Sequence, residues 1–318
     1  MTQIEAARKN IITRQMTEVA EDEGLSPEEI RALVATGEVV IPHNIHHDFR
    51  AIGIGKGLRT KVNANIGASN FHQLVRPTEE YGLHGRIGFQ PARLTGYGER
   101  WEGDDCVLWA EGTVRQGAVY GESMELHRRI EARLGESRFT IRDEVTNVGF
   151  DPTSHMYLYH VNVGWPVVDV GSEYLIPAAD GVPVAEYPTR DYRTITAPGR
   201  GFPEECYEHD TIPEPDGRVP VAVVNRAAGL GAYQLYRKEQ LPFHTMWRML
   251  GEGTYGVAME PTTNRDAGRF DAKERGELMF MQPGETRSYE LEVGALDGGP
   301  AIDAFAARVE KLKSVAHA

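Results

Sequence analysis

Two histidines and one glutamate are the residues of this chain best suited to proton-transfer chemistry. The first, His84, lies between glycines in residues 81–86 (YGLHGR), where small neighbours let the backbone and a ligand approach each other closely. A histidine that only shapes a turn fits the same segment. His84 alone therefore does not decide between a structural and a catalytic role.

The second histidine, His160, belongs to the apolar run 154–166 (SHMYLYHVNVGWP). Alternate side chains of a strand share a face, so Leu158, His160 and Asn162 point one way. His155 points the other way, and the two histidines therefore cannot easily serve one site. His160 is the better candidate because its strand runs into a Gly-Trp-Pro turn. A core histidine bonded to a backbone carbonyl is the alternative.

The glutamate, Glu260, ends an apolar strand directly before Pro261 in residues 254–264 (TYGVAMEPTTN). An unpaired carboxylate is costly to bury. Burial also raises a carboxyl pKa toward the range useful for a general base. A strand-end glutamate that points into water is the alternative.

The elements that must position these residues are short runs of alternating apolar and polar residues, separated by Gly, Pro, Asn and Asp. The runs are 105–111, 123–130, 137–146, 155–163, 218–225, 230–237, 243–250, 254–260 and 286–294. Because no helical stretch separates them, we predict a mainly β protein with an antiparallel sandwich or barrel. Two of these strands should form a hairpin around the turn 134–137. Arg128, Arg129 and residues 142–144 are expected on its solvated face, in cross-strand ion pairs.

Helical spacing marks both ends of the chain. Residues 3–36 predict a small helical unit, with Ser26 as an N-cap candidate before Pro27, and residues 51–70 predict short strands. Near the other end, a helix over 302–313 should pack one apolar stripe on the sheet. The stripe consists of Ile302, Phe305, Ala306, Val309 and Leu312. We therefore divide the chain into 1–70 and a sandwich domain, 71–318.

Composition excludes several classes of protein. The 34 Lys and Arg against 47 Asp and Glu leave a formal charge of −13, which argues against nucleic-acid and anionic membrane partners. No apolar stretch is long enough to span a membrane, and the charged N-terminus lacks a signal-peptide pattern. We therefore expect a cytoplasmic protein. Two cysteines, Cys106 and Cys206, cannot build a disulfide framework.

The segments that carry the three ionisable residues resemble the aldose 1-epimerase (galactose mutarotase-like) superfamily, most closely its uncharacterised bacterial branch. The resemblance covers residues 81–298. It rests on GLHGRIG, YGESMELHRRI, LGESRFTIRDEVTNVGF, SHMYLYHVNVGWP and GEGTYGVAMEPTTN, in that order. It implies a large antiparallel β-supersandwich that acts on a small sugar, phosphorylated or not, and it implies no metal or redox cofactor.

In that family a glutamate takes the proton of the anomeric hydroxyl, a histidine protonates the ring oxygen, and a second histidine lies nearby. By motif match, the resemblance implies Glu260 as the base, His160 as the acid and His84 as the supporting histidine. Four further residues are expected to line the sugar site: Arg86, Trp247, Arg248 and Asn264.

Residues 2–69 resemble a different family, the phosphomethylpyrimidine synthases of thiamine biosynthesis. The resemblance rests on TQIEAARKNIIT, SPEEIRALVATGEVVIPHNIHH and TKVNANIGAS. It stops before the barrel of that enzyme, and the cysteine triad that holds its radical-SAM cluster has no counterpart here. Synthase activity is therefore not expected.

The epimerase branch carries a longer first half of the sandwich before its GLHGR-like segment. Either residues 40–80 supply substitute strands here, or the sandwich is incomplete, which would favour a homodimer. The leading hypothesis is a cofactor-independent aldose 1-epimerase or related sugar-ring isomerase. The alternatives are a non-catalytic carbohydrate-binding or metabolite-binding protein on the same scaffold, and a metal-dependent sugar isomerase that uses His84, His160 and a carboxylate. The N-terminal segment could also be a fusion without a catalytic role.

Overall fold

The computed structural model describes residues 2–43, 50–59, 72–76, 79–82, 84–119, 121–187, 191–266 and 268–316. The chain divides into two compact units, Met1–Ala68 and Ser69–Ala318. Each unit has its own hydrophobic core, and each is described by itself. Part of the predicted strand region 51–70 lies outside the described residues.

The N-terminal unit contains three short helices and one small strand pair. The helices are α1 (Gln3–Arg8), α2 (Arg14–Glu23) and α3 (Pro27–Thr36), and β1 (Val39–Val40) pairs with β2 (Ile54–Gly55). The predicted cap of α3 is confirmed: the Ser26 side chain accepts from the Glu29 backbone, and the Glu29 carboxylate accepts from the Ser26 backbone. Apolar residues from all three helices, among them Met16, Val19 and Ile30, form its core.

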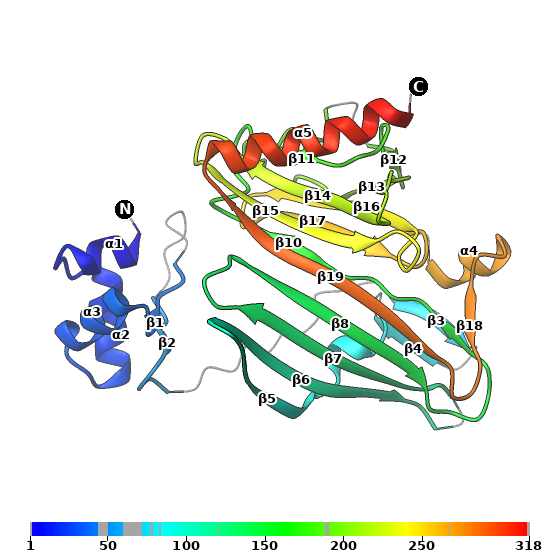
Figure 1. The fold of residues 1–318 in the computed structure, drawn as a ribbon, viewed down its shortest axis with the longest axis horizontal. Helices are drawn as coiled ribbons and strands as arrows, with labels where there is room; N and C mark the ends of the chain where they lie inside the picture. The colour runs from blue at the N-terminus through cyan, green and yellow to red at the C-terminus, as the bar shows by residue number, and fades with distance from the viewer. Residues whose placement is uncertain are drawn as a thin grey trace. The chain divides into compact units, whose positions relative to one another are not determined.

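The larger unit is built from two main antiparallel sheets, which confirms the predicted fold class (Figure 1). In spatial order, the first sheet contains β11 (Glu173–Leu175), β14 (Arg218–Asn225), β15 (Leu230–Arg237), β19 (Thr286–Asp297), β8 (Arg138–Asn147), β7 (Ser123–Arg133), β6 (Asp105–Gly117) and β5 (Arg93–Glu102). The second sheet contains β10 (Val161–Val163), β17 (Thr254–Thr262), β16 (Phe243–Gly251), β13 (Glu205–His209) and β12 (Val182–Pro183).

Smaller elements complete this unit. They are the strand pairs β9 (Thr153–His155) with β18 (Met279–Met281) and β3 (His72–Arg76) with β4 (Glu79–Gly82), the 3-10 helix η1 (Ile87–Phe89), and the helices α4 (Gly268–Glu274) and α5 (Gly299–Ala316).

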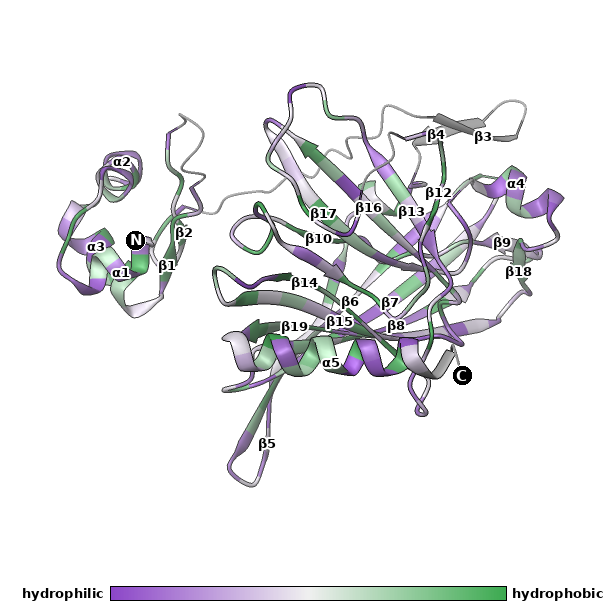
Figure 2. Cartoon of the chain, turned by 90° about the horizontal axis from the view of Figure 1, so that it is seen from above, coloured by the Kyte–Doolittle hydropathy of each residue, from purple (hydrophilic) through white to green (hydrophobic). Residues whose placement is uncertain are grey.

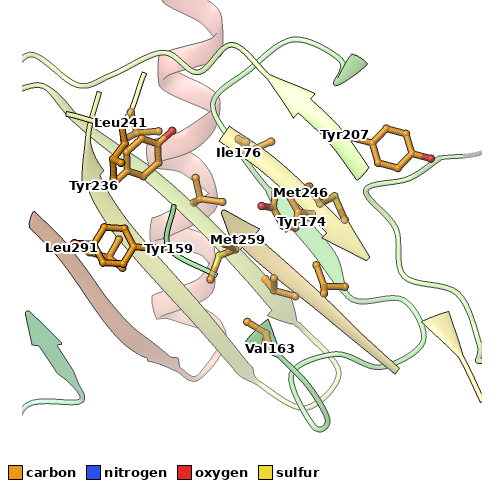
Figure 3. Packing of buried hydrophobic residues seen from close by; sticks show 14 of the residues in the cluster. Tyr159, Val163, Tyr174, Ile176, Tyr207, Tyr236, Leu241, Met246, Met259 and Leu291 are labelled. Carbon is orange, nitrogen blue, oxygen red and sulfur yellow. The ribbon is translucent and has the colours of Figure 1, made fainter. Parts of the chain in front are cut away.

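The main core lies between the two large sheets. Val221 and Leu291 from the first sheet belong to the same buried cluster as Met246, Val257 and Met259 from the second. Figure 3 labels Leu291, Met246 and Met259 of this cluster. The five-stranded sheet therefore has one face in the core, and only its other face can meet a ligand.

Helix α5 covers part of the other face of the eight-stranded sheet. Ile302, Phe305 and Val309 are buried against residues of β14, β15 and β19, which confirms the predicted stripe. Hydrophobic and hydrophilic residues alternate along this helix, as an amphipathic packing helix requires (Figure 2).

Two expectations about the strands were wrong. The predicted strand 155–163 is divided into β9 and β10, and residues 156–160 are not a strand. In addition, Asp143 is buried, although residues 142–144 were expected to be solvated. Its neighbours Arg142 and Glu144 are exposed, as the alternation of β8 requires.

Candidate active site

Strand register brings His160 and Glu260 together. Strand β10 pairs with β17 so that Val161 is opposite Met259, and an isolated bridge pairs Leu158 with Thr262 in the same register. His160 therefore lies directly opposite Glu260. Residues opposite each other in adjacent strands point to the same face.

Pro261 interrupts the ladder beside this pair. The Tyr159 backbone N–H donates to the Pro261 carbonyl, but proline has no N–H with which to return the bond. The chain before β10 therefore leaves the regular sheet while keeping its alternation: Leu158, His160 and Asn162 are exposed, and Tyr159 and Val163 are buried. His155 is on the buried side, with Nε2 2.6 Å from the Tyr289 hydroxyl, so the two histidines serve different places as predicted.

The two side chains form a close acid–base pair. His160 Nε2 lies 2.9 Å from Glu260 Oε1, and the histidine side chain is 28% exposed whereas that of the glutamate is 8% exposed. No described group donates a well-aligned hydrogen bond to Glu260 Oε1. The carboxylate is thus desolvated and retains acceptor capacity for a ligand hydroxyl.

Burial and the contact between the two side chains shift the pKa values of both Glu260 and His160. Burial raises the pKa of Glu260, and the neighbouring His160 offsets this only in part. Burial lowers the pKa of His160, but Glu260 and Asn162 outweigh it, so the net pKa of His160 is raised. A protonated histidine beside an ionised glutamate is therefore favoured over a range that extends above the ordinary histidine pKa.

His84 and Trp247 complete the surroundings of the pair. The ring centroids of His84 and His160 are 5.6 Å apart, and those of His160 and Trp247 are 5.7 Å apart with an edge-on geometry. Desolvation and the charge of His160 lower the pKa of His84, which favours a neutral imidazole. The structure thus brings together four of the seven predicted residues: His84, His160, Trp247 and Glu260.

Arg248 does not belong to this site. Its neighbour Trp247 is opposite Ala258 on the ligand face, so Arg248 must point into the core. Its guanidinium is fully buried, lies 2.6 Å from Glu205 and donates to the Tyr192 carbonyl at 2.8 Å. The expectation that Arg248 lines a sugar site is therefore wrong, because the Arg248–Glu205 ion pair is buried on the core side of the five-stranded sheet.

Asn264 and Arg86 are also engaged elsewhere. The buried Asn264 side chain accepts from the Thr263 hydroxyl at 2.9 Å and donates to the Glu277 carbonyl at 3.2 Å. Asn264 therefore stabilises the chain after β17 and does not face a ligand. This corrects the expectation that Asn264 lines the sugar site. The Arg86 guanidinium lies 3.5 Å from Glu122.

Two carboxylates near the pair, those of Glu204 and Asp266, were missed by sequence reasoning. The Trp247 indole N–H donates to Glu204, and the Asp266 backbone N–H donates to Glu208 at 2.7 Å. The charge of Glu204 acts on both His84 and His160, and that of Asp266 acts on Glu260. The surroundings of the pair therefore carry acidic groups besides Glu260.

A buried network anchors the segment that carries His160. Asp143 accepts two hydrogen bonds from Arg128, both 2.8 Å long, and one each from the Tyr157 and Tyr159 hydroxyls at 2.7 and 2.6 Å. Both tyrosines lie within three residues of His160 in the chain. The network therefore fixes the irregular backbone at the site.

Within the described ranges, no group of three or more His, Cys, Asp or Glu side chains is arranged to hold a metal ion. No helix in the described part of the chain is long and apolar enough to cross a membrane.

The larger unit shares its β-sandwich fold with a solved structure. A solved structure of a protein proposed to be an aldose 1-epimerase, from Klebsiella pneumoniae, superposes with a TM-score of 0.69 at 22% identity. The superposition covers 76% of this chain and 64% of that one, so about a third of the relative has no counterpart here. At this identity the likeness shows the fold alone.

The chain belongs to the family described as Domain of unknown function (DUF4432), which matches residues 53–295. Residues 2–81 match the Radical SAM ThiC family. Over 69 residues, the N-terminal region is 59% identical to a 5-hydroxybenzimidazole synthase from Desulfuromonas acetoxidans and 55% identical to a phosphomethylpyrimidine synthase from Thermodesulfovibrio yellowstonii. Each match covers 22% of this chain and 16% of the curated relative, so the chain spans only a small part of those enzymes.

Proposed function

We propose that this protein is a cofactor-independent aldose 1-epimerase, or a related sugar-ring isomerase, with Glu260 as general base and His160 as general acid. The observation that carries the proposal is the contact of 2.9 Å between a desolvated carboxylate and a partly exposed histidine on the open face of a sheet. Mutarotation needs two matched proton transfers, and these two groups are suited to supply them.

The proposed reaction conserves all atoms. Glu260 accepts the proton of the anomeric hydroxyl while His160 donates a proton to the ring oxygen, and the bond between the anomeric carbon and the ring oxygen breaks. The aldehyde end then rotates about the adjacent carbon–carbon bond. Ring closure reverses both proton transfers and yields the other anomer. His84 supports the ring oxygen, and the Trp247 indole offers an apolar edge to the sugar.

The pair also predicts a bell-shaped pH profile of kcat/KM. Below the acid limb Glu260 is protonated and cannot act as a base, and above the alkaline limb His160 has lost the proton that it must donate. Because both pKa values are raised, the acid limb should lie above the ordinary glutamate value of 4.5 and the alkaline limb above the ordinary histidine value of 6.5. Both limbs belong to the coupled pair.

Initial rates of anomer interconversion between pH 4 and 10, followed by polarimetry, test this profile. An alkaline limb at or below 6.5, the ordinary histidine value, would contradict the assignment of His160 as the acid. Binding of a sugar without any turnover would instead support a carbohydrate-binding protein on the same scaffold.

The acidic surroundings favour an aldose without a negative charge. Asp266 adds a carboxylate near Glu260 and Glu204 adds one near His84 and His160. Arg86 and Arg265 already pair with Glu122 and Glu208. Two like charges about 4 Å apart repel by about 1 kcal/mol in water, so sugar phosphates and uronates should react about fivefold more slowly than neutral aldoses.

The ratio of kcat/KM for an aldose to that for its 6-phosphate measures this discrimination. Glu204→Gln keeps an acceptor for the Trp247 indole but removes one charge, so it should narrow the ratio. Glu252→Gln, which changes an exposed glutamate in the turn after β16, is the matched control and should leave the ratio unchanged. Faster turnover of the phosphate by the wild type would refute the neutral-sugar preference.

A further inference from the structure

The edge strand β5 leaves one side of the eight-stranded sheet open. β5 pairs with β6 on one side, and no other strand of the described residues pairs with its outer side. In Figure 2 the β5 hairpin extends away from the rest of its sheet. An open edge presents unpaired backbone N–H and C=O groups to any strand that can match it.

The inner face of this end of the sheet carries exposed apolar side chains on either side of Glu99. Register places Tyr97 and Trp101 of β5 on the same face as Leu108 of β6 and Ile130 of β7. Tyr97 is 75% exposed and Trp101 is 59% exposed. Across the sheet, from β7 through β8 to β19, the same face packs in the main core, which contains Leu291. The exposed part is therefore core-like surface that the five-stranded sheet does not cover.

The sequence of β5 is complementary to itself in an antiparallel arrangement. With a two-fold axis at Gly98, this glycine meets the same residue of a second copy, Tyr97 meets the partner's Glu99, and Gly96 meets the partner's Arg100. Every one of these pairs joins residues that point to the same face, as an antiparallel ladder requires.

A bulge preserves this match toward the end of the strand. The register of β5 against β6 shifts between Leu94 and Gly96, which leaves Thr95 as an extra residue. Beyond it, Leu94 meets the partner's Trp101 on the inner face. Arg93 then meets the partner's Glu102 on the outer face, so the two-fold axis creates two pairs of opposite charge.

Glycine at the axis also has a packing reason. A Cβ atom at Gly96 or Gly98 would lie 3.0–3.2 Å from the Trp109 ring, so both positions must stay small. The Arg129 guanidinium lies 4.3 Å from the centroid of the same ring. The Trp109 ring thus lies against the outer face of β5 at Gly96 and Gly98, and neither glycine places a side chain of its own beside the open edge.

We propose that the β5 edge pairs with the β5 edge of a second copy of this chain, which forms a two-fold dimer with one continuous sheet through both subunits. The occupant is a second copy because one two-fold axis satisfies face, charge and bulge together. The dimer places Tyr97 and Trp101 beside inner-face side chains of the partner strand, and it does not depend on the proposed enzymatic activity.

A charge-swap series in the full chain tests the dimer by analytical ultracentrifugation. Arg93→Glu and Glu102→Arg should each raise the dissociation constant about tenfold, because each places two like-charged pairs in the interface. The double variant R93E/E102R restores opposite charges and should return the constant to near the wild-type value. Glu102 also contacts Arg100 and Arg133 within its own chain, and only the double variant separates these losses from the interface.

Arg218→Glu is the matched control, because Arg218 lies on β14 of the same sheet and pairs locally with Asp216. It should leave the dissociation constant unchanged. A wild-type chain that remains monomeric at every concentration would overturn the proposal. A dimer that survives both single substitutions unchanged, or that the double variant does not restore, would also overturn it because its interface would lie elsewhere.

Discussion

Replacement of Glu260 by glutamine is expected to lower kcat for anomer interconversion about 10³-fold while the fold is retained. The substitution preserves the shape of the side chain and removes only the group that accepts the anomeric proton. Burial raises the pKa of Glu260, so its ionised form opposes folding at neutral pH. The free energy of unfolding therefore falls as the pH rises above the ordinary glutamate pKa of 4.5. Glutamine does not ionise and lacks this penalty.

Polarimetry on a freshly dissolved single anomer measures the loss of rate, and circular dichroism on heating measures stability. The glutamine variant should unfold at the wild-type temperature or above it. Glu252→Gln again provides the control, because it removes the same charge from an exposed turn. A Glu260→Gln enzyme with the wild-type rate would rule out the proposed base.

Substitution of Asp143 by alanine should lower the free energy of unfolding of the larger unit by about 3–5 kcal/mol. The buried carboxylate accepts four hydrogen bonds, from Arg128, Tyr157 and Tyr159. Its loss leaves a guanidinium and two hydroxyl groups without their acceptor. Because Tyr157 and Tyr159 anchor the segment before β10, kcat should fall as well.

Urea unfolding followed by tryptophan fluorescence reports on this unit alone, because all four tryptophans lie within it. Glu144→Ala is the matched control, since Glu144 is the exposed neighbour of Asp143 on the same strand, and its effect should stay within about 0.5 kcal/mol. Equal midpoints for the two alanine variants would show that the network does not stabilise the fold.

Much of the sandwich could be predicted because its long strands carry clean period-2 alternation and end at turn residues. The strands β6, β7 and β14 to β17 all include their predicted runs, and β8 begins one residue after the start of its predicted run. Strand β10 was predicted too long because Pro261, on the neighbouring strand β17, has no N–H to donate to the Tyr159 carbonyl. The Tyr159 N–H does donate to the Pro261 carbonyl. Local sequence does not reveal which strand a proline will face.

The candidate site shows the same division between local and non-local information. Alternation alone separates His160 from His155, and it also argues that Trp247 and Arg248 cannot face one ligand. The pairing of Arg248 with Glu205, and the approach of Glu204 to Trp247, depend on the register between β13 and β16. Asp143 was misjudged for a related reason, because the tyrosines that bury it come from the irregular segment between β9 and β10, far away in the sequence.

The most direct test of the central claim is proton exchange NMR in D₂O on a panel of neutral aldoses with the wild-type chain. We expect exchange between the two anomeric proton signals, with no deuterium taken up at the anomeric carbon or its neighbour, because only hydroxyl and ring-oxygen protons move. The Glu260→Gln enzyme should show only the spontaneous rate. Loss of a carbon-bound proton, or no enzyme-dependent exchange for any aldose, would contradict a mutarotase that works through Glu260 and His160.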